Sequence, residues 1–168
     1  MISATTPVFP NNIIDLIATR VRLLDESLLT STYRRPLRES DPNTAAGVFA
    51  ATWEPNEDSL EIRGMGQNPG PSEPTISTYI MGVQAFVKDF DEERGLARHS
   101  VLSKMIRSML YRDAPLRVGL STLSVTMNDS VERAQRWGVR AQRYLSNEID
   151  GNFLYLSTLE FWLDTETV

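Results

Sequence analysis

Apolar residues spaced three and four apart form the first regular pattern in the chain, and this spacing places them on one face of a helix. The pattern consists of Ile13, Ile14, Ile17, Val21, Leu24 and Leu28. Asn11 or Asn12 is suited to cap the helix, which is predicted to end near Leu29. Two prolines before it predict that residues 1–11 form an extended arm, because proline disrupts a helix interior.

Two short strands are predicted next, each bordered by a loop. Residues 33–46 contain prolines and Asx side chains, which favour turns, and form the first loop. Residues 48–53 and 60–63 alternate as strands and are predicted to pair as a hairpin through a turn at 56–59. Residues 64–74 hold three glycines and three prolines, which indicates either a mobile loop or an arm that orders against a partner.

The middle of the chain contains the strongest strand pattern, over residues 75–88. Apolar residues occur on both parities of this segment, as expected of a central strand that is covered at least partly on each face. The acidic run from Asp91 to Glu93 then suits the N-terminus of a helix. Pro115 ends this second helix, whose apolar stripe consists of Leu102, Met105, Ile106, Met109 and Leu110.

The C-terminal part is predicted to be rich in strand. Residues 118–125 alternate as one strand. Residues 131–145 fit two patterns. In a helix, four arginines of this segment would share a face. In a strand, one side would carry Trp137, Val139, Ala141 and Leu145.

Two features favour the strand over residues 131–145. Gly138 weakens a helix interior, and Asp150-Gly151 is a strong signal for a hairpin turn. After this turn, residues 153–163 keep strict strand alternation. We therefore predict a long C-terminal hairpin, with one helical turn at residues 130–133 as an alternative start.

Together these elements predict an α+β fold with a mostly antiparallel sheet, two main helices packed on one face, and the long C-terminal hairpin. The strands do not alternate regularly with helices, so a sheet built from βαβ units is not expected. The length of 168 residues is that of one domain. We expect a single domain over residues 1–168, with the arm at 1–11 and the core at 12–164.

Composition argues against most kinds of catalytic chemistry. The chain has no cysteine, which excludes disulfides, thiolate catalysis and cysteine-bound metals. His99 is the only histidine, and a histidine on a charged helix face is most often a surface residue. No spacing of carboxylates matches a metal site, and Gly64-Met65-Gly66 lacks the remainder of a phosphate-binding loop. We therefore expect a protein that is not an enzyme and holds no cofactor and no metal.

The sequence also gives no sign of membrane insertion. No apolar run approaches the about 20 residues that span a bilayer. Residues 1–7 lack the basic region and apolar block of a secretory signal. The absence of cysteine suits a product of the cytosol.

Charge is unevenly distributed along the chain, whose net charge is −5. This net charge argues against duplex nucleic acid as the main ligand, because phosphate binding needs a basic face. Complementary charge blocks could instead join identical subunits, and ordinary solvated faces are the alternative. The basic candidates for such an interface are Arg133, Arg136, Arg140 and Arg143. The acidic candidates are Glu54, Glu57, Asp58 and Glu61, and a second acidic block consists of Asp89, Asp91, Glu92 and Glu93.

The layout of the elements resembles the tail-terminator, or tail-tube-capping, proteins of long-tailed bacteriophages. The resemblance covers most of residues 12–164, and nothing is transferred to the loops at 33–46 and 64–74. It rests on the opening helix Ile13-Ile14-Asp15-Leu16-Ile17-Ala18, the hairpin that bears an insert, the strand over 78–87, the helix over 101–110 and the closing strand over 153–162.

Membership of this family would imply a structural virion protein, made in the host cytoplasm and built into the tail and neck. Its copies would form a homohexameric ring that caps the tail tube at its head-proximal end, stops tube polymerisation and joins the tail to the neck. Its partners would be its own copies, the tail-tube protein and a neck or head-completion protein. Genomic DNA would pass through the ring without specific binding. Ring closure needs a heterologous interface, in which two different faces of the subunit meet. The candidate faces are the acidic clusters and the segment that carries Arg133, Arg136, Arg140 and Arg143, which we call the arginine strand.

Other interpretations stay open. Within the same class, the chain could be a head–tail connector, a tail-tube ring subunit, or a member of a phage-derived injection machine. In a different class, it could be a small-molecule-binding α+β module or an enzyme with dispersed acidic residues. An apolar pocket with converging carboxylates in the monomer would favour the latter class.

Overall fold

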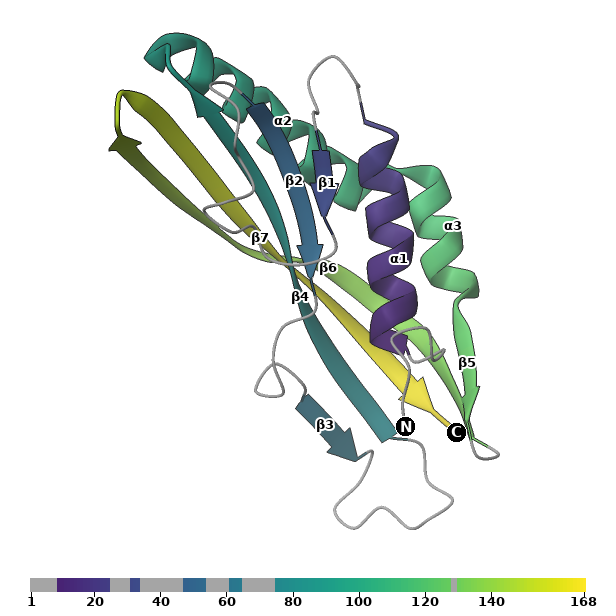
Figure 1. Ribbon diagram of the computed structural model, residues 1–168. Helices are drawn as coiled ribbons and strands as arrows, with labels where there is room; N and C mark the ends of the chain where they lie inside the picture. The colour runs from purple at the N-terminus through teal and green to yellow at the C-terminus, as the bar shows by residue number, and fades with distance from the viewer. Residues whose placement is uncertain (1–8, 25–30, 34–46, 54–60, 65–74, 128–129) are drawn as a thin grey trace, which may run out of the picture.

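The computed structural model describes residues 9–24, 31–33, 47–53, 61–64, 75–127 and 130–168. In these ranges the chain forms helices packed on a curled, mostly antiparallel sheet, which confirms the α+β prediction (Figure 1). The helices are α1 (Phe9–Arg22), α2 (Glu92–Arg112) and α3 (Ala114–Thr122). The strands are β1 (Ser31–Tyr33), β2 (Gly47–Trp53), β3 (Glu61–Gly64), β4 (Thr75–Asp89), β5 (Ser124–Met127), β6 (Ser130–Ile149) and β7 (Asn152–Thr167).

The sheet is ordered β1-β2-β4-β7-β6-β5, with β3 also paired to β4. The β1–β2 pair is parallel, and every other described pair is antiparallel. β4 lies between β2 and β3 on one edge and β7 on the other, so the prediction of a central strand is confirmed. All of β4 pairs with β7, from Thr75 opposite Thr167 to Asp89 opposite Phe153.

One apolar core joins the helices to one face of the sheet. Odd-numbered residues of β4 and β7 point into this core, and the helices contribute apolar residues spaced three and four apart. The even-numbered residues of the same strands lie on the opposite face, which we call the open face, and most are half-buried. The largest fully buried side chains of the core are Phe161, Ile13, Ile17, Met81, Leu102, Ile106, Leu110, Leu116, Leu120, Leu159 and Leu163.

The first helix was predicted in the right place but with the wrong ends. α1 begins at Phe9, so residues 9–11 do not belong to an extended arm. Pro10 fits the first helical turn, where its missing N–H has no partner to lose. The helix ends at Arg22, short of Leu29, because the next two N–H groups turn back to bond carbonyls three residues earlier. Residues 1–8 and 25–30 lie outside the described ranges.

The predicted strand over residues 118–125 is wrong, because α3 occupies most of it. Asp113 caps this helix by accepting a hydrogen bond from Leu116 N at 2.9 Å, and a proline follows in the first turn. Leu116 and Leu120, four residues apart, are buried, whereas Val118 is 62% exposed. The apparent alternation was therefore part of a helical spacing, and the strand begins only at Ser124.

The N-terminal strands also differ from the prediction. β2 and β3 do not pair with each other as a hairpin; both pair with β4, β2 along Gly82–Lys88 and β3 along Thr75–Thr78. The 15 residues of β4 are long enough to hold both in line on one edge. β1 was not predicted: it ends at Tyr33, where the predicted loop over residues 33–46 begins, and its three residues are too few to give a pattern.

The long C-terminal hairpin is confirmed. Its turn residues, Asp150 and Gly151, have φ values of 51° and 73°, as a tight turn between twisted strands requires. β6 is already extended at Ser130, so the alternative of a helical turn at residues 130–133 is wrong. Backbone bonds in both directions between Val131 and Val168 continue the ladder at the far end of the hairpin.

Candidate functional site

The outer edge of β6 is the longest free strand edge in the described part of the chain. β7 pairs with β6 along nearly its whole length, but β5 covers the other edge only from Ser130 to Arg133. Beyond that point no described strand pairs with this edge, although Tyr111 Oη donates to Val139 O at 3.4 Å. A free edge presents unpaired N–H and C=O groups to which another chain can add.

Two β-bulges interrupt β6, because Gln135 and Arg140 have no partner in β7. Each extra residue shifts the alternation of the strand by one position. Trp137 and Val139 therefore face the helices, whereas Leu145 faces the open side. The prediction that these residues share one side with Ala141 is wrong, because it assumed a strand without bulges.

The bulges also gather three of the predicted interface arginines on the open face. Arg133 and Arg136 lie opposite Glu166 and Asp164, and Arg143 lies opposite Thr158, all on the same face of β7. Arg140 is itself a bulge residue and is exposed. Residues spaced three and four apart normally share one face of a helix. Here the bulges place Arg133, Arg136 and Arg143 on one face of a strand instead.

Two of these arginines have carboxylate partners within the chain. Arg136 Nη2 lies 2.7 Å from Asp164 Oδ2, and Arg143 Nη2 lies 3.7 Å from Glu160 Oε1. Both arginine side chains stay more than 70% exposed, at 75% and 79%, so their charge still reaches the surface. A second subunit that binds this surface would contact arginines whose positive charge is already partly neutralised by Asp164 and Glu160.

The predicted acidic candidates are placed only in part. Glu54, Glu57 and Asp58 lie outside the described residues, and their role stays a prediction. Glu61 begins β3, with its backbone opposite Thr78 of β4. Because β4 and β7 separate β3 from β6, Glu61 and the arginine strand lie toward different edges of the sheet.

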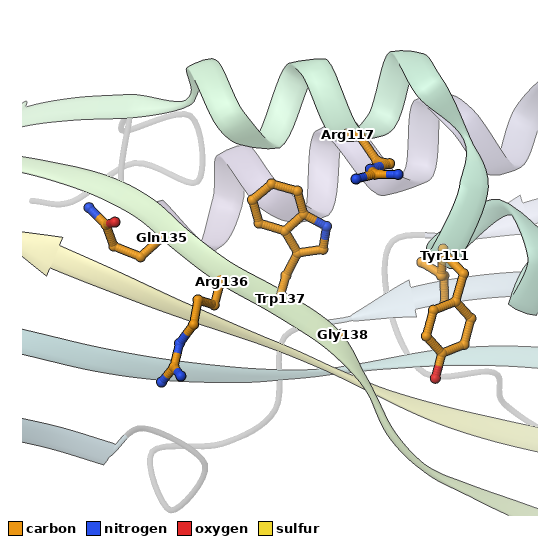
Figure 2. A pocket seen from close by; sticks show the side chains of 7 residues that line it. Tyr111, Arg117, Gln135, Arg136, Trp137 and Gly138 are labelled. Carbon is orange, nitrogen blue, oxygen red and sulfur yellow. The ribbon is translucent and has the colours of Figure 1, made fainter.

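A recess of about 400 Å³ opens where the bulged part of β6 meets the C-terminal end of α2 and the first half of α3 (Figure 2). Trp137 and Arg117 face each other across it, and Tyr111 lies on the α2 side, whereas Arg136 turns away toward the open face (Figure 2). No described residue forms an ion pair or hydrogen bond with the Arg117 guanidinium. The wall of the recess consists of Leu110, Tyr111, Arg117, Gln135, Arg136, Trp137 and Gly138.

Sequence reasoning missed this recess. It is formed by a helix that was predicted as a strand and by bulges that a single sequence does not reveal. The arginine spacing was the available signal, because residues three apart, such as Arg133 and Arg136, share a face of a strand only where an extra residue is inserted.

The turn end of the hairpin exposes large apolar side chains. Tyr144, Leu145 and Ile149 of β6 are 50%, 65% and 47% exposed. Phe90, which follows β4 at the same end of the sheet, is 58% exposed and lies under the Arg94 guanidinium at 4.5 Å. Tyr144 lies opposite Ser157 on the helix side and Leu145 opposite Leu156 on the open side, so exposed apolar side chains occur on both faces of this part of β6. Exposed apolar side chains of this size are available to a partner protein.

His99 is buried, which corrects its prediction as a surface residue. Its side chain is only 3% exposed, because this position of α2 faces the sheet beside the rings of Tyr144 and Tyr155. The Ser103 hydroxyl lies 3.2 Å from its Nε2 and 2.7 Å from the Ser157 hydroxyl. Burial lowers the pKa of His99, while a backbone hydrogen bond with Ala85 acts in the opposite direction.

This Ser–His cluster lacks the parts of a hydrolytic centre. No hydrogen bond or ion pair joins His99 to a described carboxylate, and both serines are buried, with exposed fractions of 7% and 0%. A nucleophile must reach its substrate and needs an oriented base. The cluster therefore satisfies polar groups between α2 and β7.

Asp89 joins β4 to the start of α2. Its carboxylate is fully buried and accepts hydrogen bonds from Arg94 Nε at 2.9 Å and Arg98 Nη1 at 3.1 Å. The hydrogen bonds from Arg94 hold its pKa at about 2, against the opposing effect of burial. The arrangement fixes the first turn of α2 against the end of the sheet.

The described residues contain no group of three or more acidic or histidine side chains that could hold a metal ion. In the same ranges, no helix combines the length and apolar content needed to cross a membrane. The chain matches no protein-family model and no curated protein sequence.

Proposed function

We propose that this chain is a structural subunit of a bacteriophage tail, a tail terminator whose copies form a ring at the head-proximal end of the tail tube. In that position the ring stops tube polymerisation and joins the tail to the neck. The observation that carries the proposal is the free edge of β6, with its exposed apolar and arginine side chains. Such an edge is a liability in a protein that works alone.

Several features of this edge support assembly as its role. Soluble monomers usually blunt a long edge with charges, bulges or a covering element. β6 uses bulges at two positions, but its part beyond Arg140 is regular and carries exposed apolar residues. The opposite side of the sheet ends in the short strands β1 and β3, so the two edges are unlike. Unlike surfaces on one subunit suit a heterologous interface, which closes into a ring.

The ring role also draws on the resemblance in element layout, which rests on α1, β4, α2 and β7. The hairpin that was part of this resemblance does not form, because β2 and β3 each pair with β4. Within the ring, the partners are other copies of the chain. At its two faces the partners are the tail-tube protein and a neck protein, and DNA passes through the centre.

Native mass spectrometry of the purified chain, followed by negative-stain imaging, tests the ring. A discrete ring of about six copies is expected under this proposal. Added to its cognate tail-tube protein during polymerisation, the chain should shorten the tubes and appear at one tube end. Filaments of the chain alone would favour a tube subunit instead. A chain that stays monomeric and leaves tube length unchanged would contradict the proposal.

A further inference from the structure

The two ends of α2 carry surfaces of opposite charge. At its start, Glu92 and Glu93 are exposed in the first turn. At its end, α2 is followed by α3 (Figure 1), and Arg117 of α3 lines the recess. These surfaces complement each other in sign, and each is formed by described residues.

The acidic end has carboxylates that the fold itself does not use. Asp91 is engaged as the helix cap, since it accepts a hydrogen bond from Arg94 N at 2.8 Å. The side chains of Glu92 and Glu93 have no hydrogen-bonding or ion-pair partner among the described residues. Leu96, 46% exposed, lies three and four residues further on and so shares their helix face.

The basic end has a matching composition. Arg117 is exposed and likewise without a described partner, and it faces the indole of Trp137 across the recess (Figure 2). Tyr111, 45% exposed, adds an aromatic wall. An acidic and apolar surface such as Glu92, Glu93 and Leu96 fits a recess that offers one cation between two aromatic side chains.

These two surfaces cannot meet within one copy of the chain. Glu93 and Tyr111 are separated by 18 residues of one helix, or about 27 Å at its ordinary rise. Contact between them therefore requires two copies. Repeated from copy to copy, such a contact is head-to-tail, which is the heterologous geometry that a ring needs.

We propose that the recess at Arg117 and Trp137 receives the first turn of α2 from a second copy of this chain, with Glu92 and Glu93 directed at Arg117. The inference deepens the proposed function, because it assigns the two faces of the subunit contact. It replaces neither the free β6 edge nor the arginine strand, and it adds a contact beside them.

The absence of cysteine allows a direct test of proximity. Two single-cysteine variants, Glu93→Cys and Arg117→Cys, are mixed and treated with a short bis-maleimide, and the products are identified by intact mass. A crosslinked heterodimer that forms in the mixture, and not in either variant alone, is expected. Lys104→Cys, at an exposed position in the middle of α2, replaces Arg117→Cys in the control mixture and should give no heterodimer.

Charge exchange tests whether the contact is electrostatic. Arg117→Glu and Glu93→Arg should each weaken self-association by roughly tenfold at low salt, and mixing the two variants should restore most of the loss. Lys104→Glu carries the same change of charge as Arg117→Glu and should leave association unchanged. Sedimentation velocity across a concentration series provides the measurement.

The outcomes separate this inference from the ring proposal. Wild-type rings with no heterodimer and no effect of the charge exchanges would overturn the inference and leave the ring standing. A specific heterodimer with restored association, but without a closed ring, would support the inference and contradict the ring. Crosslinking in the Lys104→Cys control at the same yield would mark the heterodimer as non-specific and overturn the inference.

Discussion

β7 and β6 are neighbours in one hairpin, yet they face different environments. β7 has a strand partner on each edge, and its odd-numbered residues, including Phe161, are buried under the helices. β6 is paired along nearly its whole length on one edge, whereas β5 covers only Ser130 to Arg133 of the other edge. It also carries two bulges and exposes four arginines. Both are long strands with aromatic residues, but β7 carries four leucines and no basic residue, whereas β6 carries four arginines. Composition and position in the sheet together decide which strand builds the core and which presents a surface.

The largest expected effect distinguishes the two strands by their burial. Phe161→Ala in β7 should lower the free energy of unfolding by about 3–5 kcal/mol, because a fully buried ring leaves a cavity. Leu145→Ala in β6, where the side chain is 65% exposed, should change it by less than about 0.5 kcal/mol. Urea denaturation monitored by tryptophan fluorescence measures both. Equal losses would mean that β6 is buried like β7.

A second prediction concerns the buried carboxylate that fixes α2 beside β7. The folded-state pKa of Asp89, about 2, lies below its ordinary value of 3.8, so the folded protein binds this proton less readily than the unfolded chain. Its contribution, about 2 kcal/mol, is present above pH 4 and is lost as the pH falls toward 2. Asp89→Asn should therefore cost stability at pH 6, and its difference from wild type should shrink in acid.

Denaturation curves at several pH values measure that difference. Glu148→Gln, which removes an exposed carboxylate of β6, is the matched control and should change stability little at any pH. A cost for Asp89→Asn that is independent of pH would show that shape and packing, more than charge, make this residue important.

The turn that joins the two strands should have a smaller effect. Gly151→Ala should cost about 1 kcal/mol, because φ is +73° and an L side chain is strained there. Asp150→Asn provides the control, since asparagine accepts the left-handed conformation observed at φ 51°. Thermal unfolding measures both. No loss for Gly151→Ala would indicate that the turn readily adopts another conformation.

The smallest effect is expected on the open face of β6. Arg136→Ala removes a 2.7 Å ion pair to Asp164, but the arginine is 75% exposed, so the loss of stability should stay below about 1 kcal/mol. Self-association should fall more clearly than stability if the arginine strand contributes to an interface. Denaturation curves measure the stability and sedimentation velocity measures the self-association, both at the same salt concentration. A large loss of stability with unchanged association would make Arg136 a structural residue.

Much of the fold could be predicted from periodicity. Central strand β4, helix α2 and the hairpin with its Asp150-Gly151 turn follow from local patterns that the folded chain keeps. α3 was missed because the alternation over residues 118–125 favoured a strand, and the capping role of Asp113 was not considered. β1 and the pairing of β3 depend on partners distant in sequence, and no local pattern encodes them.

The candidate site could be predicted only in part. The arginine cluster was evident, and three of its members do share a face. The recess was not, because its walls come from α2, α3 and β6, and Arg117 and Trp137 are 20 residues apart in the sequence. His99 was predicted to be exposed because its neighbours in sequence are charged. In the structure its position on α2 faces the sheet, whereas the neighbouring Arg98 forms an ion pair with Asp89.

The sequence by itself determined which segments are apolar on one face and where the chain turns, and the absence of cysteine excluded disulfides and thiolate chemistry. These are local properties of composition and spacing. Only the tertiary structure decided that β7 lies between two strands while β6 keeps a free edge, and that the ends of α2 carry opposite charge near different neighbours. Strand order and burial arise from contacts between distant segments, and packing of the whole chain sets them.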